Sequence, residues 1–340
     1  MDPVTQSALG ASLAQTQSNS NKVWAAAILG CIGGLAPDLD VLISSSKDPL
    51  LFLEYHRQFT HSLIFIPFGS LIVSLFCWKL FKHGLTFKEV YLFCFLGYAT
   101  HGLLDACTTY GTLLLWPFSD TRFAWNNISI IDPLLTLPLL TFVILSIARK
   151  TNFFSRVAVT WVVLYLIVGF IQRDRAIEAG KEIASSRAHQ PTRLEAKPSF
   201  GNLLLWKIVY EQEDFFYVDA VRVGITPRVY EGGKTEKLDL DKHFPWLEIG
   251  SQQRKDIKRF HWFSNNYLGI DQKNENKIID IRYSMLPDEI DALWGIELSE
   301  TASREEHVKW VTSREMNAKD IEKFWSMLFL TNLKTNNSRK

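Results

Sequence analysis

The sequence predicts an α-helical membrane bundle of about four to five spans, followed by a C-terminal α+β extramembrane domain. Long apolar runs dominate residues 23–171, whereas most of the charged residues lie in 172–340, so the hydrophobic content of 47% averages two unlike halves. Short aromatic and β-branched runs, separated by turn residues, follow in the charged half. We therefore expect a membrane-embedded domain at 1–175, a polar connector at 176–198 and a soluble α+β domain at 199–340.

The membrane spans follow from the apolar runs, because a helix that crosses a bilayer core of about 30 Å needs roughly 20 apolar residues. Five runs approach this length, and the first, fourth and fifth are short for a span. They are 23–43, 62–81, 90–115, 133–148 and 157–171. Gly30, Gly33 and Gly34 give the first run a face of small residues that lets another helix approach, unless they only loosen the backbone before a turn. The chain is thus predicted to be a multi-pass protein of the inner (cell) membrane, with the lipid bilayer as a partner.

Loop charge predicts the orientation of five spans, since cytoplasmic loops carry an excess of Lys and Arg. Most basic loop residues fall on one side of the membrane. That side has Lys22, Lys82, Lys88, Arg149, Lys150 and Arg156, and the opposite side has Lys47, Arg57 and Arg122. This excess predicts a cytoplasmic N-terminus and an extracytoplasmic C-terminal domain, which would be periplasmic in a Gram-negative host.

The C-terminal half shows runs that are typical of a small antiparallel sheet. The expected strands are 203–210, 215–223, 260–267, 278–283 and 292–298, and a helix is expected at 305–328. The net charge of +1 and the absence of a basic block argue against a nucleic-acid partner. The four cysteines lie in apolar stretches without paired spacing, which is typical of small buried hydrophobic residues. Nothing in the sequence predicts the oligomeric state.

Ionisable residues within membrane segments are costly to bury and usually have a function. Four groups of them occur in the first half. They are Asp38 and Asp40, His56 and His61, His101 and Asp105, and Asp132. In an alternating bundle, the positions of these groups at the ends of the spans fall on one side of the membrane, whichever way the bundle faces. We therefore expect them to meet.

Local spacing supports a metal site. His101 and Asp105 are four residues apart and project from one face of a helix, whereas His56 and His61, five apart, do not share a face. Imidazoles mixed with carboxylates suit Zn²⁺, Mn²⁺ or Fe²⁺ and argue against Mg²⁺ or Ca²⁺ as the preferred ion. We expect one or two divalent transition metal ions, with zinc favoured. The predicted ligands are Asp38, Asp40, His56, His61, His101 and Asp105.

Catalytic roles are assigned to Asp38, Asp40 and Arg57. A carboxylate outside the first coordination shell could act as general base, and Arg57 or Arg122 could neutralise a phosphate through its forked guanidinium. Other interpretations remain open for each residue. Asp38 could be only a turn residue, Asp132 could be the N-cap of a helix that begins at Pro133, and the two arginines could be interfacial anchors.

Three ordered motifs carry a family resemblance over about residues 1–148. They are Leu35-Ala36-Pro37-Asp38-Leu39-Asp40, His56-Arg57-x-x-Thr60-His61-Ser62-Leu63, and His101-x-x-x-Asp105-x-x-Thr108-x-x-Gly111. These motifs resemble the YdjM/YbcI family of inner-membrane metal-dependent hydrolases, and the second half looks like the extension of its longer members. The resemblance implies a helical membrane domain with a divalent metal. It also suggests a distant similarity to the zinc phospholipase C group, which is carried over for His101 and Asp105 alone.

One position departs from the family pattern. Members often have a histidine where this chain has Gln6, and glutamine is a poor ligand for zinc. The resemblance therefore implies that this chain binds one metal fewer or has reduced activity.

The sequence thus predicts a hydrolase (EC 3) that uses metal-activated water against a phosphoester or related bond in a small-molecule or lipid substrate. One alternative is a transporter or ion-handling protein, which is disfavoured because the ligands gather at one side and no inverted repeat is visible. A second alternative is a non-catalytic structural or regulatory membrane protein in which the metal only braces the helices.

Overall fold

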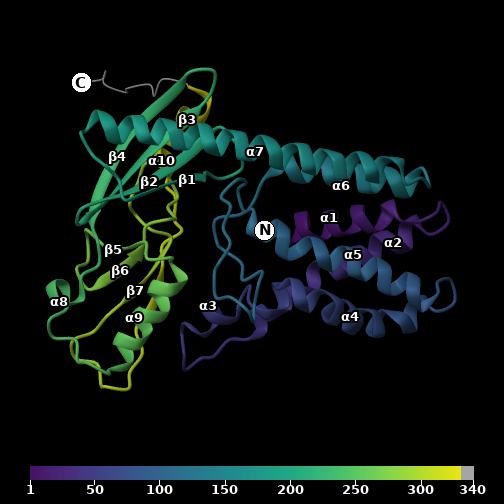
Figure 1. Ribbon diagram of the computed structural model, residues 1–340, viewed down its shortest axis with the longest axis horizontal. Coiled ribbons are helices and arrows are strands. Elements are labelled where there is room, and N and C mark those ends of the chain that lie inside the picture. The colour runs from purple at the N-terminus through teal and green to yellow at the C-terminus, as the bar shows by residue number, and fades with distance from the viewer. Residues whose placement is uncertain (331–340) are drawn as a thin grey trace. The chain divides into compact units, whose positions relative to one another are not determined.

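A helical unit and a sheet-containing unit make up residues 1–330, the part of the chain that the computed structural model describes (Figure 1). The first, here called the membrane unit, comprises Met1–Ser46, Leu51–Ile171 and Phe200–Asn202. The second, called the C-terminal unit, comprises Lys47–Leu50, Gln172–Ser199 and the described residues from Leu203 onward.

The membrane unit is built of α-helices and short 3₁₀ helices. In chain order they are α1 (Pro3–Thr16), α2 (Val23–Leu35), η1 (Ala36–Leu42), α3 (Leu51–Tyr55), η2 (Phe59–His61), η3 (Leu63–Phe65), α4 (Ile66–Phe81), α5 (Phe87–Ala106), α6 (Pro133–Ala148) and the first part of α7 (Phe153–Ser186). Three helical stretches are long and apolar enough to cross a membrane: Val23–Leu42, Leu63–Phe81 and Phe153–Ser186. The helix Pro133–Ala148 is apolar but shorter.

Glycines bring α1, α2 and α5 into backbone contact. A Cβ on Gly10 would lie 2.4 Å from the carbonyl oxygen of Gly30, and a Cβ on Gly97 would lie 2.1 Å from that same oxygen. Small residues at such crossings allow helices in a membrane to approach closely. The first span therefore uses its small-residue face for packing. The third predicted span is shorter than expected, because α5 ends at Ala106 and Gly111 takes a positive φ of 88° soon afterwards.

The C-terminal unit contains two antiparallel four-stranded sheets, each in sequential strand order. The first has β1 (Arg193–Pro198), β2 (Leu205–Gln212), β3 (Phe215–Val223) and β4 (Pro227–Glu236), and the second has β5 (Leu268–Ile270), β6 (Lys277–Asp280), β7 (Trp294–Glu297) and β8 (Lys309–Thr312). Its helices are the end of α7, α8 (Leu240–His243), α9 (Gln252–Phe263) and α10 (Ala318–Phe329). Val209, Phe216 and Val218 of the first sheet pack with Ile279 of the second in one buried core.

Three local predictions in this unit are corrected. The first half of the segment 260–267, expected as a strand, belongs to α9, which Ser251 caps and whose Ile257, Phe260 and Phe263 are buried at helical spacing. The helix expected at 305–328 begins only at Ala318, and β8 precedes it. The predicted connector at 176–198 is folded, because α7 continues to Ser186 and β1 follows.

Candidate metal centre

Three segments of the membrane unit bring the candidate ligands together. Asp38 and Asp40 lie on η1, which continues directly from α2 at Ala36. His61 ends η2, and its carbonyl oxygen would lie 2.3 Å from a Cβ at position 102 of α5, so the glycine there allows η2 to rest against that helix. One turn of α5 carries His101 and Asp105 on the same face.

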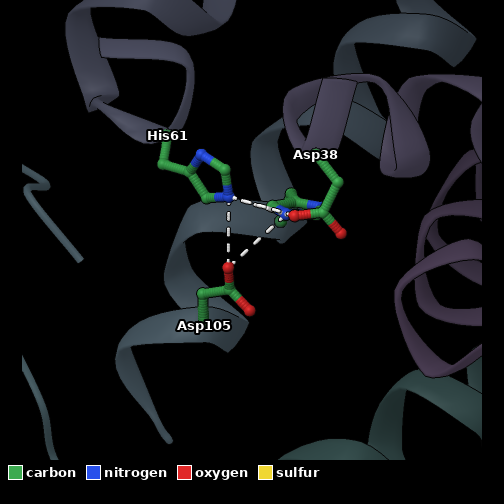
Figure 2. Close-up of side chains that lie close together, drawn as sticks. Asp38, His61 and Asp105 are labelled. Atoms are coloured by element: carbon green, nitrogen blue, oxygen red, sulfur yellow. Dashed lines mark hydrogen bonds and ion pairs between the residues drawn. The ribbon is translucent and has the colours of Figure 1, made fainter. Parts of the chain in front are cut away.

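Four side chains form a buried cluster of ring nitrogens and carboxylate oxygens (Figure 2). The Nε2 atoms of His61 and His101 lie 3.0 Å apart. His61 Nε2 lies 3.2 Å from Asp105 Oδ2 and 3.5 Å from Asp38 Oδ1, and the corresponding distances from His101 Nε2 are 3.5 and 3.3 Å. Ligands placed tetrahedrally about 2.0–2.1 Å from a zinc ion lie about 3.3–3.4 Å from each other. The cluster therefore fits a small tetrahedral cation.

Hydrogen bonds on the far side of each ring fix how the two histidines face the cluster. The Nδ1 of His101 lies 2.5 Å from the carbonyl oxygen of Gly34, which can only accept. The Nδ1 of His61 lies 3.2 Å from Asp40 Oδ2 and 3.0 Å from Thr60 Oγ1. If each Nδ1 carries the proton of a neutral imidazole, both Nε2 lone pairs point at each other, which is unfavourable unless a cation lies between them. Such outer partners are typical of metal-bound histidines.

Asp105 is fully buried, and polar groups surround it. Gln6 Nε2 donates to Asp105 Oδ1 over 2.9 Å and to the His101 carbonyl oxygen over 3.2 Å, and the α-amino group of Met1 also contacts Oδ1. The other carboxylate oxygen, Oδ2, accepts no hydrogen bond although it lies 3.0 Å from Arg57 Nε. A buried acceptor without a hydrogen bond is costly, and a metal ion would satisfy it. Gln6 thus touches a candidate ligand.

Arg57 is buried beside the cluster, with 5% of its surface exposed, and adopts a positive φ of 65°. Its backbone N–H donates to Asp40 Oδ2 over 3.0 Å, and its guanidinium donates to Thr108 Oγ1 over 3.0 Å while pairing with Asp105. This burial contradicts the alternative that Arg57 is an interfacial anchor. Its guanidinium compensates the charge of a candidate ligand, and its contact with a substrate stays a prediction.

A second group lies closer to solvent. Asp38, Asp40 and His56 also offer ligand atoms within 4.8 Å of one another, and Asp38 belongs to both groups. The side chains of Asp38 and His56 are 24% and 18% exposed, whereas that of Asp40 is buried. His56 Nδ1 lies 2.7 Å from Asp40 Oδ1, so an ion held by this group would replace that hydrogen bond.

Two residues considered from the sequence do not join the cluster. Asp132 is the N-cap of α6, as one of the two interpretations of the sequence predicted, and it accepts a hydrogen bond from the backbone N–H of Leu134 over 3.2 Å. It also accepts a hydrogen bond from the Tyr165 hydroxyl over 2.7 Å. Arg122 donates to the carbonyl oxygen of Gly111 over 3.0 Å.

Helix α1 and the polar groups that support the ligands were not predicted from the sequence. Asp2 caps α1 and Pro3 opens it, which is a recognisable helix-start signal. That helix carries Gln6 to the cluster. Thr60, which donates to Asp40 Oδ2 over 2.8 Å, lies in the motif that carries His56 and His61, but its role depends on the turn.

These features define a protein of the membrane-helix class with a buried cluster of imidazoles and carboxylates that could hold a divalent metal. The chain belongs to the family described as YdjM inner membrane protein, which matches residues 1–176. The family match covers α1 to the middle of α7, and therefore every candidate ligand.

Two curated relatives match shorter parts of the chain. The inner membrane protein YbcI of Escherichia coli (strain K12) is 36% identical over 105 residues, which are 30% of this chain and 60% of that protein. The uncharacterized protein YfhP of Bacillus subtilis (strain 168) is 32% identical over 101 residues, which are 30% of each chain. The chain thus spans less than two thirds of either relative. No solved structure matches it.

Proposed function

We propose that this chain is a membrane-bound metal-dependent hydrolase. Asp38, His61, His101 and Asp105 would hold a divalent transition metal, zinc first and manganese or iron as alternatives. The observation that carries the proposal is the spacing of their ligand atoms, 3.0–3.5 Å for the five measured pairs, in a buried setting. Two nitrogens and two carboxylate oxygens form a donor set that these metals accept and that Mg²⁺ or Ca²⁺ disfavours.

The second group supplies the open position that catalysis needs. A metal with four protein ligands is typical of a structural site, whereas a catalytic metal keeps one position for water or substrate. Asp38, Asp40 and His56 offer three ligands, share Asp38 with the first group and lie nearer solvent. When bound there, a second ion would supply Lewis acidity and lower the pKa of water. We therefore propose that the substrate arrives from the His56 side.

Residues beside the two groups would position ligands and move protons. Asp40 Oδ2 accepts hydrogen bonds from the Thr60 hydroxyl and from the Arg57 backbone N–H. Its other oxygen, Oδ1, lies against His56 Nδ1, so Asp40 orients that imidazole. A carboxylate that is not coordinated, Asp38 or Asp40, would accept the proton of the attacking water. The positive charge of Arg57 would offset the negative charge of a phosphoester that binds in the site. The proposed substrate is a phosphoester or related bond in a lipid or amphiphile, because the site belongs to a unit of apolar helices.

We further propose that α5 and α6 cross the membrane together with the three longer apolar stretches, which gives five spans. Under this count the loop charges place the turn between α1 and α2 in the cytoplasm and the C-terminal unit in the periplasm. The predicted cytoplasmic N-terminus then needs correction, because Met1 contacts Asp105 at the end of α5 and so lies at the opposite end of α1 from that turn. Fusions of alkaline phosphatase or a fluorescent protein to the C-terminus would test the orientation, since the first is active only outside the cytoplasm and the second fluoresces inside it.

Elemental analysis of detergent-purified protein tests the metal. We expect a stoichiometric transition metal in the wild type, its loss in His101→Ala and Asp105→Asn, and its retention in His83→Ala, which changes an exposed histidine outside both groups. If the wild type carries no metal after growth and purification in metal-replete medium, the protein is not a metal-dependent hydrolase and the proposal is wrong.

The variant His56→Ala separates catalysis from bracing. The closed four-ligand set specifically favours the second candidate function, a metal that only holds the helices together. If the protein is a hydrolase, His56→Ala should keep the metal of the first group but lose turnover of lipid phosphoesters. A wild type that holds metal and turns over no phosphoester in a broad panel would favour bracing.

A further inference from the structure

Hydrogen bonds link the β3–β4 hairpin of the C-terminal unit to Gln172, the residue that follows the apolar part of α7. The apolar part of α7 ends at Ile171, and the next residue, Gln172, begins the C-terminal unit. Gln172 Nε2 donates to the carbonyl oxygens of Leu203, over 3.1 Å, and of Val223, over 3.0 Å. Val223 is the last residue of β3. The β3–β4 hairpin therefore turns next to the point at which α7 leaves its apolar segment.

The tip of this hairpin is apolar and exposed. Gly224, Ile225 and Thr226 connect β3 to β4, because Val223 pairs with Pro227 as the last rung of the ladder. Ile225 is fully exposed, at 103% of its reference surface. A β-branched apolar residue at a hairpin tip gains nothing in water, but it gains free energy when it enters a bilayer.

Helix α10 adds a second apolar surface beside the hairpin. It buries Phe324, Met327 and Leu328 against the unit. A second apolar stripe remains outside, formed by Ile321, Trp325 and Phe329, which are 46%, 49% and 64% exposed. These side chains recur every four residues and so share one helical face, and the Trp325 and Phe329 rings stack with centroids 5.5 Å apart.

Two hydrogen bonds hold the end of α10 at the hairpin. Arg222 Nε donates to the carbonyl oxygen of Leu328 over 2.6 Å, and the Tyr230 hydroxyl donates to that of Met327 over 3.0 Å. Arg222 and Tyr230 lie on β3 and β4, respectively. The exposed aromatic face of α10 and the hairpin tip thus belong to one surface, which we call the interfacial patch: Ile225, Trp325 and Phe329 with Arg175, Arg222 and Arg228.

Three arginines lie close together in the interfacial patch. Arg222 and Arg228 face each other across the ladder, and the Arg175 guanidinium donates to the Gly224 carbonyl oxygen. Within residues 1–330, none of these three forms an ion pair, and the nearby Asp174 pairs with Arg173 instead. Like charges directly opposite in a sheet are destabilising. An anionic surface would relieve this repulsion.

We propose that the interfacial patch inserts into the headgroup region of the membrane that α7 crosses, and that its arginines contact anionic phospholipids. Tryptophan and other aromatic residues are favoured at the membrane–water interface, and basic residues there attract anionic lipid. Each arginine near such a surface contributes about 1 kcal/mol, which corresponds to about a fivefold change in the docking equilibrium. The C-terminal unit then has a second attachment to the bilayer besides α7. This proposal does not depend on metal chemistry.

The test places a nitroxide label at the hairpin tip of the full chain in vesicles. The labelled variant is Ile225→Cys, and the matched control is Ile249→Cys, which replaces another highly exposed isoleucine (85%) of the same unit outside the interfacial patch. Labelled parent protein corrects for the native cysteines. In phosphatidylcholine vesicles with phosphatidylglycerol, we expect the label at 225 to collide readily with oxygen and several-fold less with a water-soluble nickel complex than the label at 249. Equal exposure of both labels to nickel would overturn the proposal.

Two further measurements separate lipid from other occupants. Arg222→Gln with Arg228→Gln should raise the nickel accessibility of the label at 225, and so should removal of phosphatidylglycerol from the wild-type vesicles. If neither change has an effect, the anionic-lipid assignment is wrong. Dipolar broadening between labels at 225 on different molecules would show that a second copy covers the interfacial patch, which also overturns the proposal.

Discussion

Gly97→Ala is expected to weaken metal binding although it changes no ligand. A Cβ at this position of α5 would lie 2.1 Å from the carbonyl oxygen of Gly30 and 2.9 Å from the backbone nitrogen of Gly34, both in α2. Real Cβ atoms stay at least 3.0 Å from such neighbours, so the two helices must separate by about 1 Å. His101, one turn further along α5, hydrogen-bonds to Gly34 and would move with its helix.

The size of this effect follows from the stiffness of metal coordination. Ligand distances in metal sites vary by only about 0.2 Å, so binding must pull the displaced helices back together. Overpacking of this kind costs about 1–3 kcal/mol. If binding has to overcome that whole cost, the affinity for the metal falls roughly 5- to 150-fold.

The assay is competition of the detergent-purified protein with a chelator of known affinity, with circular dichroism to verify that the helices remain. Gly84→Ala is the matched control, since a Cβ there meets nothing within 4 Å in the loop between α4 and α5. Wild-type metal affinity in Gly97→Ala would show that the α2–α5 crossing does not set the geometry of the site.

Three further outcomes are expected. Burial lowers the pKa of Lys207 to about 7 from 10.5, so between these values the unfolded chain holds more protons and stability rises with pH, by up to about 1.4 kcal/mol per pH unit. Lys207→Met should remove this pH dependence of the unfolding free energy, measured by urea unfolding of the C-terminal unit. An unchanged pH dependence would show that other groups cause it. Gln6→His should tighten metal binding by adding an imidazole beside Asp105, and unchanged competition with a chelator would place this position outside the coordination sphere. Asp48→Asn breaks a forked pair with Arg259, at 2.9 Å on both arms, and should lower the unfolding free energy of the C-terminal unit by about 1 kcal/mol, whereas Asp174→Asn at an exposed pair should have little effect.

The membrane half was more predictable than the C-terminal half, because long apolar runs carry their own signal. The fourth predicted span coincides with α6, and three of the other runs overlap helical stretches that are long and apolar enough to cross a membrane. In the C-terminal half the apolar runs are short, and periodicity alone does not separate a buried helix from a strand. The segment 260–267 was assigned wrongly for that reason, since Phe260 and Phe263 fit either pattern until the cap at Ser251 is considered.

The candidate ligands could be found from the sequence because burying ionisable groups among apolar helices is costly, which makes them conspicuous. Their supporting contacts could not be found in this way. The pairing of Asp105 with Arg57 depends on a positive φ at Arg57, and the contact of Gln6 depends on a helix too short and polar to be recognised as membrane-spanning. Such contacts follow from tertiary geometry, not from spacing along the chain.

The charges of the candidate site favour a bound cation, whatever its relatives bind. As ligands of a metal ion, His61 and His101 would be neutral imidazoles with the proton on Nδ1, where the outer hydrogen bonds lie. The remaining side chains are three carboxylates, Asp38, Asp40 and Asp105, and one guanidinium, Arg57, which sum to a charge of −2. The α-amino group of Met1, which contacts Asp105, changes this sum to −1 when it carries its proton. Uncompensated charge among apolar helices is strongly unfavourable. A divalent cation would offset this excess of negative charge and would also separate the two Nε2 lone pairs.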